Sequence, residues 1–395
     1  MKYASVTERL AHLGSAKWDI HLKAKAMQAA GIDLILLTIG EPDVPTPDHL
    51  VEAAKQAMDA GRLGYSNGRG EPGLLSALAS KYSVRTGREI TSRQVLALPG
   101  TQTALYATLN ALVGPGDEVL VGDPLYACYE GVIAAPGGGM VPVPLLPENG
   151  FRMQAADVAE RITPKTRLLF LNSPHNPTGA VLRREDIEAL GRLAVEHDLW
   201  ILSDEVYEEM VYIGTDFVSP FDLDWLADRV VVCSSISKSH AAPGFRSGWC
   251  VGSEDFISHL QPVAETMLFG NQPFIADMTE LAVSQRSPVA AGMAERFARR
   301  ADILFKRLNG VCGLAVHRPE AGMFSVVDIR SSGMTGVEFA TALLEEERVA
   351  IMPGESFGPA LNGWLRISLT KPDEEIFTAC NRILSLVART QGKAA

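Results

Sequence analysis

From about residue 95 onward, short apolar runs alternate with segments of helical periodicity. The apolar runs carry Val, Ile and Leu on successive positions, which is typical of strands buried on both faces of a sheet. Helical patterns lie between them, at Thr101–Leu112, Leu125–Ala135 and Arg184–His197. This alternation predicts an α/β fold whose larger part is a mostly parallel sheet flanked by helices. The predicted strands are Val95–Leu98, Glu118–Val121, Arg167–Leu171, Leu199–Leu202, Val230–Cys233 and Trp249–Val251.

The C-terminal third has a different pattern. Pro288–Asn309 is one long helical segment, and a closing helix is predicted near Asp373–Ala388. Between them, Met323–Ile329 and Leu365–Ser368 are strand-like runs. Leu34–Ile39 is a further strand-like run, which we expect to pack with this C-terminal part. We therefore predict a large domain over residues 46–287 and a smaller α/β domain made of residues 1–45 and 288–395.

Composition and charge narrow the class of protein. Of the 395 residues, 47% are hydrophobic and 21% are charged, which is an ordinary globular balance. A net charge of −11 argues against nucleic acid as a partner, since phosphate binding needs clustered cations. The apolar runs are too short for a membrane span, and the first residues lack the apolar core of a secretory signal.

The cysteines and histidines add two expectations. The five cysteines are scattered, odd in number and never spaced as C-x-x-C, which is typical of reduced thiols in a cytoplasmic protein. The eight histidines show no metal-ligand spacing, and so we expect no metal.

Polar or glycine-rich segments follow four of the predicted strands. They are Pro99–Gln102, Asn172–Gly179, Ser203–Tyr207 and Ser234–Lys238, the last continuing to Pro243–Arg246. In an open parallel sheet, ligands bind at the carboxyl ends of the strands. We therefore expect these segments to converge on one crevice.

Each segment allows two interpretations when it is taken alone. Gly100-Thr101-Gln102 is a phosphate cradle at a helix N-terminus or a plain turn capped by Thr101. Asp204 is either a buried carboxylate that needs a cationic partner or the residue that caps the next helix. Lys238 is a desolvated nucleophile towards carbonyls or a solvated loop lysine, and Arg246 binds phosphate or holds a loop.

Taken together, the segments favour one cofactor chemistry. A pyridine-ring cofactor with an aldehyde and a phosphate needs a lysine, a carboxylate for the ring nitrogen and an anion site. The strand ends supply all three. The turn at Asn176–Gly179 also aims the amide of Asn176 inward, where it could donate to a ring hydroxyl.

On these segments, the chain resembles the class I/II aminotransferases that depend on pyridoxal 5'-phosphate, the fold type I family. The matching segments occur in the family's order and span nearly the whole chain. They are Ile39–Asp43, Asn172–Gly179, Ser203–Tyr207, Ser235–Trp249 and Leu365–Ser368.

The resemblance implies roles around the cofactor ring. Lys238 binds the aldehyde covalently and then acts as general base, while Asp204 pairs with the ring nitrogen. Tyr126 stacks on the ring, and Tyr207 and Asn176 donate to its oxygen. The phosphate would be held by Gly100, Thr101, Gln102, Ser235, Ser237 and Arg246.

The resemblance also implies how the substrate and a second subunit are bound. Arg366 takes the substrate α-carboxylate as a fork-to-fork pair, with Gly40 and Asn176 beside it. Tyr65 reaches the phosphate in the neighbouring subunit, which implies a homodimer with shared active sites. The reaction so implied moves the α-amino group of an L-amino acid to a 2-oxo acid in a ping-pong cycle.

The amino donor is less well defined by the sequence. Related bacterial aspartate aminotransferases commonly carry lysine at the position of Thr101, which argues against aspartate here. Trp18–His21, Ser173–His175 and Ser237–His240 resemble arginine–pyruvate transaminases instead. Asp19 is then a candidate partner for a cationic side chain, or else the cap of a helix. An aspartate or aromatic aminotransferase and a β-lyase stay open as alternatives.

Two short motifs suggest other classes of protein. Ser235–Lys238 matches S-x-x-K of serine hydrolases, but the companion K-T-G is absent. Gly68–Gly73 matches G-x-G-x-x-G, but no strand pattern precedes it, so we interpret the match as chance. A binding protein without activity is disfavoured because Lys238 and Asp204 are both present. His240, close to Lys238, either supports the site or packs in the core.

Overall fold

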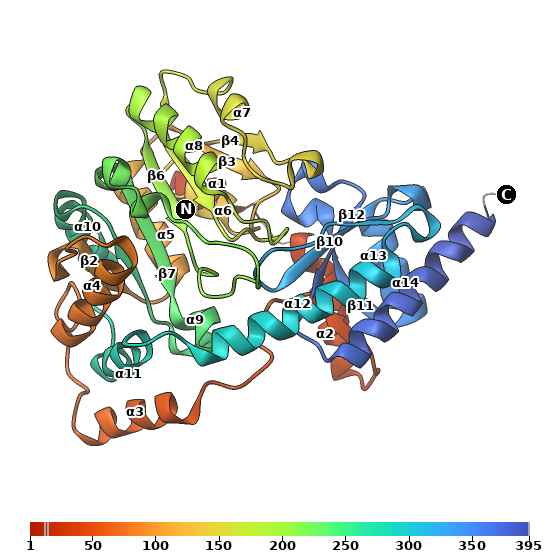
Figure 1. Cartoon of the computed structure of the whole chain (residues 1–395), viewed down its shortest axis with the longest axis horizontal. Coiled ribbons are helices and arrows are strands. Elements are labelled where there is room, and N and C mark those ends of the chain that lie inside the picture. Colours follow the sequence, from red (N-terminus) through yellow and green to blue (C-terminus); the bar gives the residue numbers. More distant parts are fainter. Residues whose placement is uncertain (12, 14–15, 394–395) are drawn as a thin grey trace.

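The computed structural model describes residues 1–11, 13 and 16–393, and it has two lobes, each built on a sheet (Figure 1). The large sheet has the order β2-β8-β7-β6-β5-β3-β4, in which β4, β3, β5, β6 and β7 run parallel. Strand β8 is antiparallel to both β7 and β2. The mostly parallel sheet is therefore confirmed, with β8 as its reversed strand. The strands are β2 Val95–Leu98, β3 Glu118–Asp123, β4 Gly139–Pro144, β5 Thr166–Asn172, β6 Trp200–Asp204, β7 Val230–Ser235 and β8 Gly248–Val251.

The large sheet is covered by helices on both faces, because successive strand residues enter different cores. Ile201 of β6 belongs to the core that contains Leu190 of α8 (Arg184–Glu196). Leu202 belongs to the core that contains Leu105 of α5 (Thr101–Leu112). The continuous apolar runs are explained by this double burial. Other helices of this lobe are α3 Asp48–Asp59, α4 Pro72–Thr86, α6 Tyr129–Ala134, α7 Ala155–Ala159, α9 Ile236–Ser239, α10 Glu254–Met267 and α11 Pro273–Val283.

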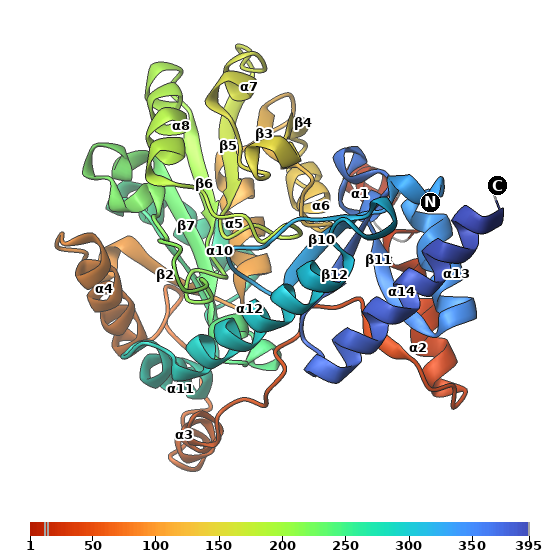
Figure 2. The same ribbon diagram turned by 45° about the vertical axis from the view of Figure 1, so that its right-hand side comes forward.

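The small lobe contains the second sheet, with the order β1-β11-β12-β10-β9. Strand β1 pairs with β11 in parallel, which confirms that the N-terminal strand joins the C-terminal part, and the other pairs are antiparallel. Helices α2, α13 and α14 lie in this lobe (Figure 2). The elements are α2 Asp19–Ala29, β1 Ile35–Leu37, β9 Ala315–Val316, β10 Phe324–Asp328, α13 Gly336–Glu347, β11 Val349–Pro353, β12 Trp364–Ser368 and α14 Asp373–Lys393.

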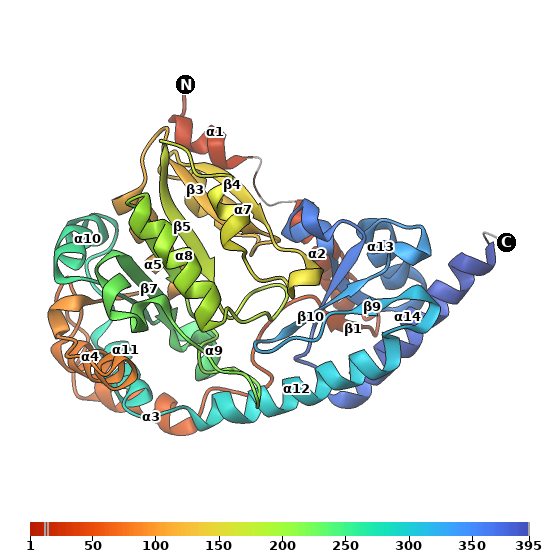
Figure 3. The same ribbon diagram turned by 45° about the horizontal axis from the view of Figure 1, so that its top comes forward.

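Two segments connect the lobes. Helix α12 (Pro288–Leu308) runs from the large lobe to the small one (Figure 3). Helix α1 (Ser5–Ala11) lies against the large lobe, where Arg9 donates to the carbonyls of Ala134 and Ala135 at the end of α6. The domain limits after residues 45 and 287 stay a prediction.

Two local expectations need comment. The predicted helix at 125–135 begins only at Tyr129, because the Leu125 amide donates to Phe357 O of the small lobe (2.7 Å). No strand precedes Gly68 among the described residues of that segment, so the dinucleotide interpretation is excluded. None of the described helices combines the length and apolar character needed to cross a membrane.

Candidate active site

A cavity of about 280 Å³ lies at the carboxyl ends of β5, β6 and β7, where the large sheet faces β10 and β12. Side chains from both lobes line it. Most of the residues singled out in the sequence lie on its wall: Gly40, Thr101, Gln102, Tyr126, Asn176, Asp204, Tyr207, Ser235, Ser237, Lys238, Arg246 and Arg366.

Three of the predicted residues lie outside this wall. Gly100 precedes α5 with φ +87°, and a Cβ there would come within 2.3 Å of Arg246 Nη2, so the position requires glycine. Tyr65 is 92% exposed. Asp19 is exposed at the first position of α2 and makes no capping hydrogen bond, so the cap interpretation of Asp19 is wrong.

Lys238 is presented by α9, directly after β7. The Ser235 hydroxyl accepts from the Ser237 amide (3.3 Å) and starts this short helix. Lys238 Nζ donates to Gly40 O of the other lobe at 2.6 Å. Burial lowers the Lys238 pKa to about 8, although the charge of Glu41 opposes the shift. A much larger fraction of this amine than of an ordinary lysine is therefore neutral, and so nucleophilic, near neutral pH.

Asp204 ends β6 and is almost fully buried. Its Oδ2 accepts from the Tyr129 hydroxyl (2.7 Å) and its Oδ1 from the Val206 amide (3.2 Å). Burial raises the Asp204 pKa to about 6, against the effect of these hydrogen bonds. In the described part of the chain, no lysine, arginine or histidine forms an ion pair with it. The carboxylate therefore suits a cationic ligand. It does not cap a helix, because a turn and not a helix follows Asp204.

Arg366 projects from β12 between two aromatic rings. Its guanidinium carbon lies 4.0 Å from the ring centre of Phe324 and 4.3 Å from that of Phe357. The guanidinium donates to Asn176 Oδ1 (3.2 Å) and to Thr38 O, while its buried Nε has no partner. Burial lowers the Arg366 pKa to about 9, opposed by the nearby tyrosines. No carboxylate of the described chain pairs with Arg366, which leaves it free for a carboxylate ligand.

A candidate anion site lies at the N-terminus of α5. The first amides of a helix have no acceptor within the helix, and the buried Thr101 Oγ1 at the first position of α5 has no hydrogen-bond partner among the described residues. Ser235, Ser237 and Arg246 line the same cavity. A buried hydroxyl without a partner beside a helix N-terminus fits a phosphate.

The donor set as a whole therefore fits pyridoxal 5'-phosphate. The amine of Lys238, the unpaired carboxylate of Asp204 and the anion site match its aldehyde, its ring nitrogen and its phosphate.

Three wall residues were missed by the sequence analysis, namely Leu105, Tyr129 and Phe324, and the last two contact site residues directly. Tyr129 holds Asp204, and Phe324 packs on Arg366. Both look like ordinary core aromatics in the sequence, because their partners lie 75 and 42 positions away in the chain. Trp18, which the sequence indicated only as part of a longer segment, also lines the cavity. His240 Nε2 donates to Ala282 O (2.9 Å), and the ring lies outside the cavity wall, so His240 packs in the core.

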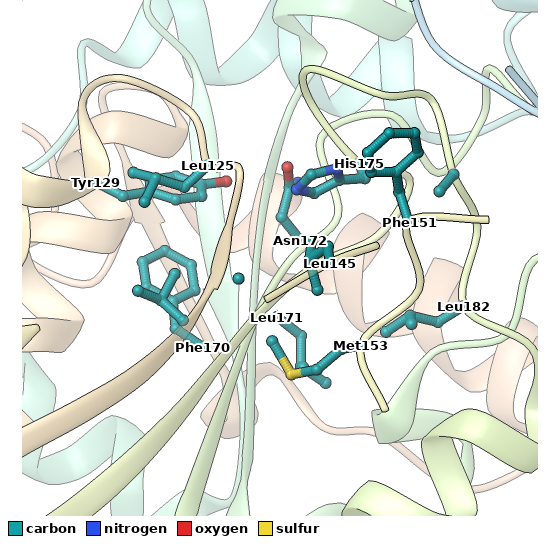
Figure 4. A pocket seen from close by; sticks show the side chains of 13 residues that line it. Leu125, Tyr129, Leu145, Phe151, Met153, Phe170, Leu171, Asn172, His175 and Leu182 are labelled. Atoms are coloured by element: carbon teal, nitrogen blue, oxygen red, sulfur yellow. The ribbon is translucent and has the colours of Figure 1, made fainter. Parts of the chain in front are cut away.

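A second cavity, of about 20 Å³, lies behind the site and shares Tyr129 and Asn172 with it (Figure 4). Its wall is mainly apolar, with Phe151 and Met153 opposite Phe170. Burial lowers the pKa of its one histidine, His175, to about 4, and the Nδ1 of that ring pairs with Thr178 Oγ1 (2.7 Å). The cavity has room for little more than one water molecule, so we interpret it as packing space.

Comparison with known proteins agrees with this chemistry. Residues 32–383 match the family model of aminotransferase class I and II. The chain is 43% identical over 394 residues to an arginine–pyruvate transaminase of Pseudomonas aeruginosa, covering 100% of both chains. It is 36% identical to an aspartate aminotransferase of Streptomyces avermitilis, covering 95% of each. Aspartate aminotransferase from Thermus thermophilus superimposes with a TM-score of 0.90 at 32% identity, covering 98% of this chain and 100% of that one.

The chain belongs to the class I and II aminotransferases. It is a pyridoxal 5'-phosphate-dependent enzyme that transfers an amino group from an amino acid to a 2-oxo acid. The match of Ser235–Lys238 to a serine-hydrolase motif is therefore coincidental.

Proposed function

We propose that this aminotransferase takes L-arginine as amino donor and pyruvate as acceptor. Full-length similarity to an arginine–pyruvate transaminase supports this pair. Thr101 supports it as well, since a hydroxyl replaces the lysine that would attract a second carboxylate. The single observation that carries the reaction is that the Lys238 amine, which forms no ion pair, shares one cavity with Asp204 and Arg366.

Two neighbouring residues, Trp18 and Asp19, support a cationic donor. Trp18 lines the cavity, and Asp19 follows it at the start of α2. An indole face attracts a guanidinium through its π electrons, and a nearby carboxylate adds charge selectivity. An aspartate aminotransferase is the second candidate, supported by the Streptomyces relative.

Different residues of the cavity would hold different parts of the cofactor. Pyridoxal phosphate, when bound, supplies an aldehyde that takes the amino group and a ring that accepts electrons as the α-proton leaves. Thr101, Ser235, Ser237, Arg246 and the α5 N-terminus would hold its phosphate, with Gly100 and Gln102 beside them. Asp204 would hold the ring nitrogen in its protonated form, and Tyr126 would cover the ring. Asn176 and Tyr207 would donate to the ring oxygen.

Arg366 and Lys238 act on the amino acid itself. The Arg366 fork, with Gly40 and Asn176 nearby, would take the α-carboxylate and so fix the orientation of the α-carbon. Lys238, as a neutral amine, would accept the α-proton and return it during the same half-reaction. A lowered Lys238 pKa favours this role, because the amine can gain and lose a proton near neutral pH.

We also infer a homodimer with shared sites. Tyr65 is exposed, and its ring meets the exposed ring of Phe269 edge to face, with centroids 6.2 Å apart. Leu63 and Leu268 are exposed beside them in the chain. Two distant segments thus form one apolar surface, which is typical of a protein interface. A second copy of the chain is its proposed partner, with Tyr65 reaching the phosphate in that copy.

The dimer is tested by the molar mass in solution and by complementation. Tyr65→Ser and Lys238→Ala variants are purified, mixed and refolded together. If sites are shared, the mixture gains activity that neither variant has alone, whereas an active Tyr65→Ser variant would contradict the role of Tyr65.

The compartment we propose is the cytoplasm. Cys233 Sγ and Cys250 Sγ lie 3.5 Å apart on paired strands as free thiols, which suits a reducing environment. Cell fractionation with a tagged chain tests this.

Donor and acceptor profiling tests the proposed reaction. Purified enzyme loaded with pyridoxal phosphate is offered arginine, aspartate, alanine and phenylalanine, each with pyruvate and with 2-oxoglutarate. We expect kcat/KM to be highest for arginine with pyruvate. A preference for aspartate with 2-oxoglutarate would favour the second candidate, and release of ammonia with no aminated product would favour a β-lyase. If the purified protein shows no visible absorption band, or shows one that borohydride does not bleach, both candidates are contradicted.

A further inference from the structure

A group of buried charges lies behind the turn that carries Asp204 and Tyr207. We call it the α4 ion cluster, and it consists of Lys81 and Arg85 from α4 together with Glu205, Glu208, Glu209 and Asp222. Lys81 Nζ lies 2.9 Å from Glu208 and 2.7 Å from Glu209. Arg85 Nη1 lies 2.9 Å from Glu205 and 2.6 Å from Glu208, and Arg85 Nε lies 2.9 Å from Asp222.

The cluster is built into the protein interior. The side chain of Glu205 is 0% exposed and that of Glu208 is 7% exposed. Lys81 and Arg85 stand four residues apart, so both project from one face of α4. Burial alone would raise the Glu208 pKa, but these two cations outweigh it and hold the pKa below its usual value. The Ser219 hydroxyl adds a hydrogen bond to Glu205.

Residues of the turn alternate between the cluster and the cavity. Asp204 and Tyr207 line the cavity, while Glu205 and Glu208 bind the cations of α4. The turn is closed by the Glu208 amide, which donates to Glu205 O at 2.9 Å. Since only a few bonds separate the two sets, fixing the glutamates fixes the directions of Asp204 and Tyr207.

A purely stabilising role would not need charges at this place. Well-packed apolar residues often stabilise a protein as well as a buried ion pair does, since the pair must first lose its water. A guanidinium that binds three carboxylates instead imposes a direction on each of them. These directional contacts act on the segment that presents Asp204 and Tyr207 to the cavity.

We propose that Lys81 and Arg85 are positioning residues, which hold Asp204 and Tyr207 in the orientation that binds the cofactor ring. The proposal rests on the proposed function, in which these two side chains contact that ring. Neither cation lines the cavity, so their effect is transmitted through Glu205 and Glu208.

The test is Arg85→Lys, which keeps the charge and removes the fork that joins three carboxylates. The rate of pyridoxal phosphate release from the loaded enzyme is measured by scavenging, together with the visible absorption band at one pH. We expect release at least fivefold faster and an altered band. We also expect kcat to fall at least fivefold while KM for the donor changes less than twofold, because Arg366 is untouched.

The matched control is Arg300→Lys. Arg300 is a buried arginine that binds Asp43 (2.7 Å) and Asp373 (3.0 Å), away from the turn. The Arg300→Lys variant should have a lower melting temperature than wild type, as Arg85→Lys should, but it should release the cofactor at the wild-type rate. Equal acceleration in both variants would mean general loosening and would overturn the proposal.

Three further outcomes are decisive. A folded Arg85→Lys enzyme with wild-type release and an unchanged band overturns the positioning role. If Arg85→Lys does not fold, the isosteric Glu208→Gln is measured in the same way, and wild-type release there overturns it equally. A wild-type protein that never binds pyridoxal phosphate contradicts the proposed function instead, which keeps the two failures distinct.

Discussion

The cavity and the α4 ion cluster lie on opposite sides of one turn, and the pKa values of their buried lysines are shifted in opposite directions. In the cavity, burial shifts Lys238, Asp204 and Arg366 towards their neutral forms, with pKa values of about 8, 6 and 9. In the cluster, attraction outweighs burial for Lys81 and raises its pKa. Among the described residues, the three cavity groups form no ion pair with one another or with any neighbour.

The difference shows how a binding site is distinguished from a structural ion cluster. Charges that serve structure find their partners within the chain, whereas charges that serve a ligand are left without one. Glu205 is the intermediate case, since burial raises its pKa to about 7 although Arg85 binds it. The comparison can be tested by removing charges on each side of the turn.

The largest effect is expected from Lys238→Ala. Loss of both the amine that binds the aldehyde and the general base should lower kcat/KM by roughly 10⁴-fold or more. Steady-state rates with arginine and pyruvate measure it, and circular dichroism checks the fold. Lys165→Ala, at an exposed lysine, is the control. Activity of Lys238→Ala within tenfold of wild type would reject the assignment.

Arg366→Lys should have the next largest effect. A lysine keeps the charge but loses the bidentate fork and the stacking on Phe324 and Phe357. We expect kcat/KM to fall about 100-fold, which corresponds to about 2.7 kcal/mol. The loss should be similar for every α-amino acid donor, because the α-carboxylate is common to all. A loss of kcat/KM restricted to the donor L-arginine would mean that Arg366 contacts the side chain of the donor and not its α-carboxylate.

Removing a charge should change the free energy of unfolding in opposite directions on the two sides of the turn. The Asp204 pKa is raised from 3.8 to about 6, so the folded chain binds the extra proton and loses stability as pH rises from about 4 through 6. Asp204→Asn cannot ionise, and should be more stable than wild type at pH 7.5 by up to about 3 kcal/mol. Glu208→Gln breaks paired charges and should be less stable by about 3 kcal/mol.

Urea denaturation of the cofactor-free protein at pH 5 and pH 7.5 measures both variants. The advantage of Asp204→Asn should shrink at pH 5, where the wild-type carboxyl is largely protonated. The same sign for both variants at pH 7.5 would remove the distinction between the two sides.

The smallest effect is expected from Asp19→Ala. Asp19 is exposed, so its attraction for a guanidinium is screened by water and is worth about 1 kcal/mol or less. We expect kcat/KM to fall about threefold to fivefold for arginine and to stay unchanged for alanine. Equal losses for the two donors would rule out an ion pair with the donor side chain.

Much of the cavity could be predicted from local sequence. The apolar runs that end at Leu171, Leu202 and Cys233 predict buried parallel strands, and such strands place their carboxyl ends at one edge of the sheet. That is why Lys238, Asp204 and Asn176 can be grouped from the order of residues along the chain. Strand β4 was missed because it is an edge strand with two prolines and a glycine, and its apolar pattern is weak.

What the sequence by itself determined was which chemical groups stand at the strand ends, because burial on both faces leaves a continuous apolar run that any window detects. Only the tertiary structure decided that β8 runs antiparallel, that Tyr129 donates to Asp204 and that Arg366 lies between two phenylalanines. It alone also placed α4 behind the turn. These contacts join residues far apart in the chain, and local periodicity carries no information on which distant surfaces will meet.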